Sequence, residues 1–279
     1  MRLDARARLQ LLLLVMSIAL AGCGSPSGLL FYPMKDYVRT PQQLDLAYQD
    51  VSLKAADGVE LFAWYLPPQG EPRGNLLYLH GNGENISTHM LSIAWLPEQG
   101  YGVLALDYRG YGRSQGKAKL PDVFLDLEAA SDWLFANTEA PHFLLGQSLG
   151  AALAAGFSNH PKAQHFNALL LDAPFARYQD IGRYALSRSW FGRVVLSPAV
   201  RLLPDGYDPQ ERIVESRLPT LFYASPNDAV VPLSHTEALY QAAPEPKQLS
   251  LHQGGHIATY GYPDQRQLTL QFLQRYSRE

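Results

Sequence analysis

The stretch that decides the fold runs Pro141-His142-Phe143-Leu144-Leu145-Gly146-Gln147-Ser148-Leu149-Gly150 and continues into Ala151-Ala152-Leu153-Ala154-Ala155. An apolar run, a Gly-x-Ser-x-Gly pattern and a run of small residues predict a strand, a sharp turn and a helix. At Gly146 and Gly150 a larger side chain would collide with the adjoining strand and helix, so Ser148 is expected in a strained turn. Its hydroxyl would stand above a sheet, at a helix N-terminus whose free amides stabilise negative charge.

Two other interpretations of such serines stay in view. Ser148 could simply cap the N-terminus of a helix, a position that serine favours. The same pattern recurs at Gly112-Arg113-Ser114-Gln115-Gly116, but no strand leads into this second serine and no helix leaves it. We interpret residues 112–116 as an irregular loop and Ser114 as non-nucleophilic. The bare five-residue pattern is therefore weak without its strand and helix.

Apolar runs alternate with helical patterns from residue 75 to the C-terminus, which is typical of a mainly parallel sheet covered on both faces by helices. Strands are expected at residues 50–55, 59–66, 75–79, 103–107, 142–145, 168–172, 220–224 and 248–252. Helices are expected at residues 86–99, 123–137, 149–159, 233–243 and 264–276. Asp57-Gly58 predicts an antiparallel hairpin between the first two strands. The sequence therefore predicts one α/β domain at residues 29–279, with an eight-stranded, mostly parallel sheet.

The alternation breaks at residues 173–218, before the strand at 220–224. One or two helices fit there, with Trp190 and Phe191 on an apolar side. A small cap over a site and a connecting helix packed on the sheet are both compatible with this segment. Together with Phe175, these aromatic residues suggest an apolar acyl pocket, although aromatic residues on an insert commonly serve packing.

A serine hydroxyl needs a base to take its proton and a carboxylate to orient that base. Asp228 directly follows the strand at 220–224, and His256 follows the strand at 248–252. Both would project from the carboxyl edge of the sheet, which also carries Ser148 and where open parallel sheets hold their ligands. The three residues are therefore candidates for one catalytic site.

Each partner of the serine has competitors. Asp228 could be a turn residue that bonds its own backbone. Asp172 and Asp107 also end strands, and we expect the latter to form an ion pair with Arg109. His252 lies four residues before the candidate base, but the paired glycines before His256 favour the later histidine.

With these motifs in place, the chain resembles the alpha/beta-hydrolase superfamily over nearly all of the sequence that follows residue 28. The matching motifs are His80-Gly81-Asn82-Gly83, Asp107-Tyr108-Arg109-Gly110-Tyr111-Gly112, Gly146-Gln147-Ser148-Leu149-Gly150, Asp228 before Val231-Pro232, and Gly255-His256. The chain is most similar to the branch of serine aminopeptidases and monoacylglycerol-lipase-like esterases, which includes membrane-associated acyl-thioesterases. The nucleophile and its two partners stand in the order Ser, Asp, His that this fold uses.

The resemblance implies an alpha/beta-hydrolase fold, an acyl-Ser148 intermediate, His256 as base and Asp228 as its orienting acid. It also implies an oxyanion hole from the backbone amides of Asn82 and Leu149, which stabilise the charge developing on the substrate oxygen. A tight turn without chemistry is the alternative for the glycines at 81 and 83, and His80 is expected to have a structural role. Gln147 departs from the His, Tyr or Glu of relatives, and we expect it to shape the pocket.

The N-terminus carries a targeting signal, residues 1–22, with Arg2, Arg6 and Arg8 before the apolar residues 9–20. Leu20-Ala21-Gly22-Cys23 resembles a bacterial lipobox, so Cys23 is expected to take a lipid and residues 23–28 to form a tether. A chance cysteine in an ordinary signal peptide or an uncleaved anchor is the alternative. Gly24 favours the outer membrane, facing the periplasm, if the cell is Gram-negative. Cys23 is the only cysteine, so no intrachain disulfide can form.

Charge and chemistry narrow the function. Removal of residues 1–22 changes the net charge from −3 to −5, and a mildly acidic body without a basic stripe argues against nucleic-acid binding. The hypothesis is a lipid-anchored serine hydrolase that cleaves an ester or thioester of a small-molecule or lipid-like acyl substrate. No cofactor and no metal are expected, since the histidines and carboxylates lack metal-ligand spacing. A peptidase or acyltransferase on the same residues, or a catalytically silent binding protein of the envelope, is the alternative.

Overall fold

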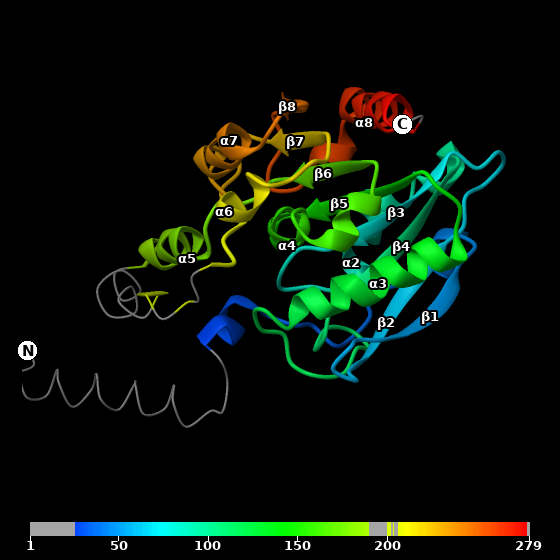
Figure 1. Ribbon diagram of the computed structural model, residues 1–279, viewed down its shortest axis with the longest axis horizontal. Coiled ribbons are helices and arrows are strands. Elements are labelled where there is room, and N and C mark those ends of the chain that lie inside the picture. Colours follow the sequence, from blue (N-terminus) through cyan, green and yellow to red (C-terminus); the bar gives the residue numbers. More distant parts are fainter. Residues whose placement is uncertain (1–25, 190–199, 202, 204–205, 278–279) are drawn as a thin grey trace, which may run out of the picture.

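The computed structural model describes residues 26–189, 200–201, 203 and 206–277. It contains the expected eight-stranded sheet, in the order β1-β2-β4-β3-β5-β6-β7-β8 (Figure 1). The strands are β1 Gln49–Lys54, β2 Glu60–Leu66, β3 Gly74–Leu79, β4 Tyr101–Asp107, β5 His142–Gln147, β6 Ala168–Asp172, β7 Thr220–Ala224 and β8 Lys247–Leu251. Strand β2 pairs antiparallel with β1 and β4, and every other pair is parallel. The carboxyl ends of β3 to β8 therefore share one edge.

The helices follow the expected pattern. They are α2 Ile86–Ile93, α3 Val123–Asn137, α4 Leu149–Phe157, α5 Tyr178–Ser187, α6 Pro209–Ile213, α7 Leu233–Ala242 and α8 Pro263–Arg275. Short 3-10 helices are η1 Pro26–Leu30, η2 Pro41–Leu44, η3 Pro97–Gln99, η4 Pro161–His165 and η7 Thr259–Gly261. Helix α2 ends at Ile93 rather than at residue 99, and Pro97, which has no amide hydrogen to donate, begins η3.

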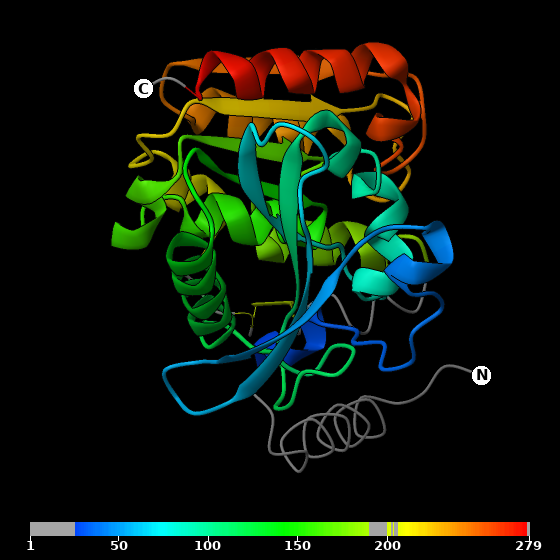
Figure 2. The same cartoon turned by 90° about the vertical axis from the view of Figure 1, so that its right-hand side faces the viewer.

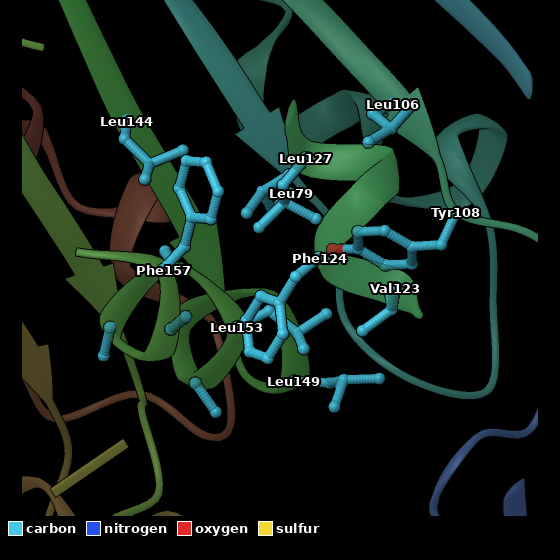
Figure 3. Packing of buried hydrophobic residues seen from close by; sticks show 14 of the residues in the cluster. Leu79, Leu106, Tyr108, Val123, Phe124, Leu127, Leu144, Leu149, Leu153 and Phe157 are labelled. Carbon is cyan, nitrogen blue, oxygen red and sulfur yellow. The ribbon is translucent and has the colours of Figure 1, made fainter. Parts of the chain in front are cut away.

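Alternate residues of the strands enter two separate cores. Leu77 and Leu79 of β3 join a cluster that α3, α4, α6 and α7 cover, and Figure 3 shows part of it. Leu76 and Tyr78 of the same strand join a second cluster under α2 and α8. In Figure 2, helix α8, in red, runs along the top of the molecule above the strands. The near-continuous apolar strands are thus explained by burial on both faces.

The insert contributes α5 and α6. Arg212 on α6 donates from Nε to the carbonyl oxygen of Gly156 on α4 at 2.6 Å. The hydroxyl of Tyr184 and the guanidinium of Arg188 both donate to the carbonyl oxygen of Ala229, at 3.3 and 3.0 Å. Phe175 is buried against Tyr178, whereas Trp190 and Phe191 lie outside the described residues. The described part of the insert thus packs beside the loop after β7, and a cap remains a prediction.

The chain already packs against the folded body near residue 27, close to the start of the described residues. Ser27 is fully buried, accepts a hydrogen bond from the amide of Leu120 at 3.0 Å and donates to that residue's carbonyl oxygen at 3.4 Å. Ser27 lies within residues 23–28, which were expected to form a tether, and the tether itself remains a prediction. Residues 1–22 and Cys23 lie outside the described residues. Within the described ranges, no helix has the length and apolar character needed to cross a bilayer.

Candidate active site

Ser148 occupies a strained turn between β5 and α4. Its backbone has φ 53° and ψ −116°, a conformation that residues with side chains rarely adopt. A Cβ on Gly146 would overlap the carbonyl oxygen of Gly150, and a Cβ on Gly150 would overlap that of Leu79. The amide of Ser148 donates to the carbonyl oxygen of Asp172 at 2.8 Å, which fixes the turn to β6. The glycines are therefore required by close backbone contact, as the sequence predicts.

The Ser148 side chain does not cap α4, which removes the alternative of a capping serine. Instead, Ser148 Oγ lies 2.9 Å from His256 Nε2, and His256 Nδ1 lies 2.7 Å from Asp228 Oδ2. Because a carboxylate only accepts, Nδ1 carries a proton and donates it, so Nε2 of the neutral ring accepts from the hydroxyl. The structure thus brings together the three residues that the sequence nominated.

Asp228 combines the turn role and the orienting role. Its Oδ1 accepts from the amides of Val230 and Val231 at 2.8 and 2.9 Å, while Oδ2 faces His256. Burial tends to raise the pKa of Asp228, but the hydrogen bonds from His256 and from the two amides lower it overall. The carboxylate therefore stays charged, which suits a group that stabilises an imidazolium.

The competing residues are occupied elsewhere. Asp172 is fully buried and accepts from Thr259 Oγ1 at 2.6 Å and from Gln147 Nε2 at 2.7 Å. His252 Nδ1 accepts from the amide of Gly254, so its Nε2 carries the ring proton and donates to Thr259 Oγ1 at 3.0 Å. This buried chain supports the loop that carries His256. Thr259 had no signal in the sequence, because its partner lies 87 residues away.

Gln147 also joins this buried chain. It is fully buried, and its Oε1 accepts from the hydroxyl of Tyr78 at 2.5 Å. The expectation that Gln147 shapes the pocket is therefore wrong, since its side chain lies under the turn and both of its polar ends are used in the interior. It braces β5 against β3 and β6 at the position next to Ser148.

The amides proposed for the oxyanion hole lie on two segments that touch. A Cβ built on Gly81 would lie 3.5 Å from Ser148 Cβ, so the loop after β3 lies directly over the serine. His80 Nδ1 donates to the carbonyl oxygen of Gly81 at 2.7 Å, in agreement with a structural role. Among the hydrogen bonds of the described residues, none uses the amide of Asn82 or of Leu149. These two amides are therefore available to a substrate oxygen.

Comparison with known proteins places this site in a family. The family model described as serine aminopeptidase, S33, matches residues 70–210, which include the loop after β3 and Ser148. The chain belongs to the alpha/beta-hydrolase superfamily. The match ends before Asp228 and His256, so in this alpha/beta hydrolase the assignment of these two residues depends on their sequence positions and their geometry.

Relatives cover most of this alpha/beta hydrolase. It is 31% identical to the Salmonella typhi protein YfhR over 249 residues, 82% of this chain and 80% of that protein. It is 31% identical to the alpha/beta hydrolase domain-containing protein WAV2 of Arabidopsis thaliana, over 88% of this chain and 84% of that protein. The structure of the Pyrococcus furiosus esterase Pf2001 matches with a TM-score of 0.75 and 22% identity, covering 88% of this chain and 98% of that one. This last likeness shows a shared fold.

The loop after β4 differs in one respect from expectation. Arg109 is buried and pairs with Asp126 on α3 and with Asp57 in the first hairpin, each at 2.7 Å, rather than with Asp107. Ser114, in the second Gly-x-Ser-x-Gly pattern, is buried and donates to the carbonyl oxygen of Asp107 at 2.6 Å, while it accepts from the amide of Phe62. It is therefore a structural serine in an irregular loop.

The buried carboxyl of Asp107 should make the free energy of unfolding depend on pH. Burial raises its pKa from 3.8 to about 6, against hydrogen bonds from the hydroxyl of Tyr37 and the amide of Ile86. The folded protein thus binds this proton more tightly than the unfolded chain, so the stability that it contributes is present below pH 3.8 and lost as the pH rises through about 6. Asp107→Asn should therefore gain stability relative to the wild type by about 2 kcal/mol between pH 4 and pH 7. Urea unfolding at both pH values measures this difference, and a difference independent of pH would contradict the prediction.

Proposed function

We propose that this alpha/beta hydrolase cleaves a carboxylic ester or thioester through an acyl-serine intermediate on Ser148. The observation that carries the proposal is the continuous hydrogen-bonded path from Asp228 through His256 to the serine hydroxyl, at 2.7 and 2.9 Å. A serine hydroxyl in ordinary structural use has no need of a strained turn and a buried carboxylate behind its partner. The family membership and the free amides of Asn82 and Leu149 support the same chemistry.

The proposed cycle uses residues of the chain and one water molecule. Ser148 Oγ attacks the carbonyl carbon while His256 Nε2 takes the hydroxyl proton, and the amides of Asn82 and Leu149 stabilise the oxyanion. The tetrahedral intermediate collapses, the imidazolium gives its proton to the departing alcohol or thiol, and the acyl group stays on Oγ. A water then attacks the acyl-enzyme with His256 as base, which releases the carboxylic acid and restores the serine.

The leaving group separates the proposal from its alternative. The matching family model is named for serine aminopeptidases, so an aminoacyl amide is the second candidate substrate. The same acyl-serine serves both, and turnover of short acyl esters, acyl thioesters and aminoacyl amides distinguishes them. Failure of a fluorophosphonate to label the protein would sink both candidates and favour a silent binding protein.

The same proposal includes a lipid anchor on Cys23 and a place in the bacterial cell envelope. The order of basic, apolar and small residues before the cysteine supports it. Wild-type protein should therefore incorporate labelled palmitate and remain with membranes after a carbonate wash. Cys23→Ser should incorporate no palmitate. It should also lack the membrane retention that the lipid on Cys23 provides. Equal palmitate incorporation by both proteins would rule out an anchor on this cysteine.

A further inference from the structure

The segment after η1 lies across the loop after β3. We call residues 30–38 the strap and residues 80–85 the oxyanion loop. Asn82 Nδ2 donates to the carbonyl oxygen of Leu30 at 2.7 Å, and Asn82 Oδ1 accepts from the amide of Tyr32 at 2.9 Å. The hydroxyl of Tyr111 donates to the same Oδ1 at 2.7 Å. The side chain of Asn82 is therefore held from the strap and from the loop after β4.

A second asparagine repeats this arrangement three residues later. Asn85 Nδ2 donates to the carbonyl oxygens of Met34 and Asp36 at 3.2 and 2.8 Å. Its Oδ1 accepts from the amide of Ser87 and so caps α2. The strap is fixed in turn by Phe31, which is buried in the core. Two side chains of the oxyanion loop thus bind main-chain atoms of the strap.

His80 and the strap hold Gly81 and Asn82, the two residues joined by the peptide bond that carries the Asn82 amide. His80 is neutral, because burial lowers its pKa to about 3, and its Nδ1 donates to the carbonyl oxygen of Gly81. In a planar trans peptide this oxygen and the N–H of Asn82 point in opposite directions, so the histidine sets the direction of the amide. Gly83 follows with φ +80°, a conformation natural to glycine. The space around its Cα is open, since an added Cβ would meet no atom within 4 Å, so packing at Gly83 does not fix the Asn82 amide. The side chain of Asn82 therefore supplies the remaining hold on this amide.

From these contacts we infer that the strap is part of the catalytic apparatus: it positions the backbone amide of Asn82 for the oxyanion by binding the Asn82 side chain. The inference rests on the proposed acyl-serine function, since an oxyanion hole has a use only in that chemistry. The side chain of Asn82 and the amide of Tyr32 act through main-chain geometry, so they are positioning groups, whereas the Asn82 amide contacts the oxyanion. The effect belongs to the transition state, where the substrate oxygen is charged, and not to ground-state binding.

The strap allows a matched pair of variants. The Tyr32 side chain is 65% exposed, whereas its amide makes the bond to Asn82. Tyr32→Pro removes that amide hydrogen, and Tyr32→Ala keeps it and serves as the reference for loss of the side chain. The full-length variants are compared on p-nitrophenyl butyrate, with active enzyme counted by complete fluorophosphonate titration. Binding of a butyl trifluoromethyl ketone, whose serine adduct carries an oxyanion, is measured in parallel.

We expect kcat of Tyr32→Pro to be about 10-fold below that of Tyr32→Ala with similar KM, and the inhibition constant of the ketone to rise by the same factor. Asn82→Ala should lower kcat about 100-fold, again with little change in KM. If Tyr32→Pro does not fold, Asn82→Ala carries the test by the same readouts. Equal kcat and ketone affinity in the proline and alanine variants, or an unchanged kcat in Asn82→Ala, would overturn the inference. A wild-type protein that neither turns over the ester nor reacts with the fluorophosphonate would instead overturn the proposed function.

Discussion

Replacement of Ser148 by alanine should lower ester hydrolysis by about 10⁶-fold, to the background of the assay, and abolish covalent labelling by a fluorophosphonate. The loss is large because His256 and Asp228 contribute to the reaction only by activating the serine hydroxyl. The hydroxyl is the group that His256 Nε2 contacts at 2.9 Å, so no neighbouring oxygen stands in its place. Initial rates on p-nitrophenyl butyrate and mass spectrometry of the labelled peptide measure the two effects.

Ser114→Ala is the matched control for this experiment. It removes a serine from the second Gly-x-Ser-x-Gly pattern, but that serine is 1% exposed and bonded to the backbone. We expect Ser114→Ala to be less stable and to label at a rate close to that of the wild type. Labelling that persists in Ser148→Ala, or that disappears only in Ser114→Ala, would show that the nucleophile is misassigned.

Replacement of Asp228 by asparagine should lower kcat by about 10⁴-fold while the fold is kept. The oxygen of the introduced carboxamide can still accept from the amides of Val230 and Val231, but its NH₂ group would donate to His256 Nδ1. The ring would then carry its proton on Nε2, where it cannot take the proton of the serine. Steady-state kinetics and thermal unfolding of the same samples separate this effect from loss of structure.

Asp172→Asn distinguishes the two carboxylates that end neighbouring strands. Neither oxygen of Asp172 contacts His256, because Thr259 and Gln147 occupy both. The variant should therefore keep kcat within about 10-fold of the wild type, with the main change in its stability. If Asp172→Asn were inactive and Asp228→Asn were active, Asp172 and not Asp228 would be the acid that orients His256.

The sequence predicts the sheet well because strands that are buried on both faces consist mainly of apolar residues. Strands covered on both faces read as apolar runs, and the helix at 123–137 agrees residue for residue with α3. Ser148, Asp228 and His256 could be nominated for a related reason. Each directly follows a strand whose carboxyl end must lie at the same edge, so topology alone brings them close.

The errors concern side chains whose partners are distant in sequence. Arg109 has Asp107 two residues away, but in three dimensions α3 and the first hairpin bring Asp126 and Asp57 closer. The side chain of Gln147 points into the protein interior from β5. Its partners, Tyr78 and Asp172, lie on the neighbouring strands β3 and β6, so they follow from the strand order and not from the local sequence. The strap was invisible for another reason. Its contacts with the oxyanion loop use main-chain atoms, which carry no residue-type signal.

Recognition through main-chain atoms makes the strap a replaceable module. Asn82 and Asn85 bind carbonyl and amide groups at residues 30–36, so these four hydrogen bonds require no particular side chains there, while the buried side chain of Phe31 fixes the strap. A hydrolase body of this type could therefore accept a different leader, a different anchor or a soluble fusion partner upstream, provided that the path of the chain over the loop is kept. A change upstream of the strap would then leave the hydrogen bonds that hold the oxyanion loop unaltered.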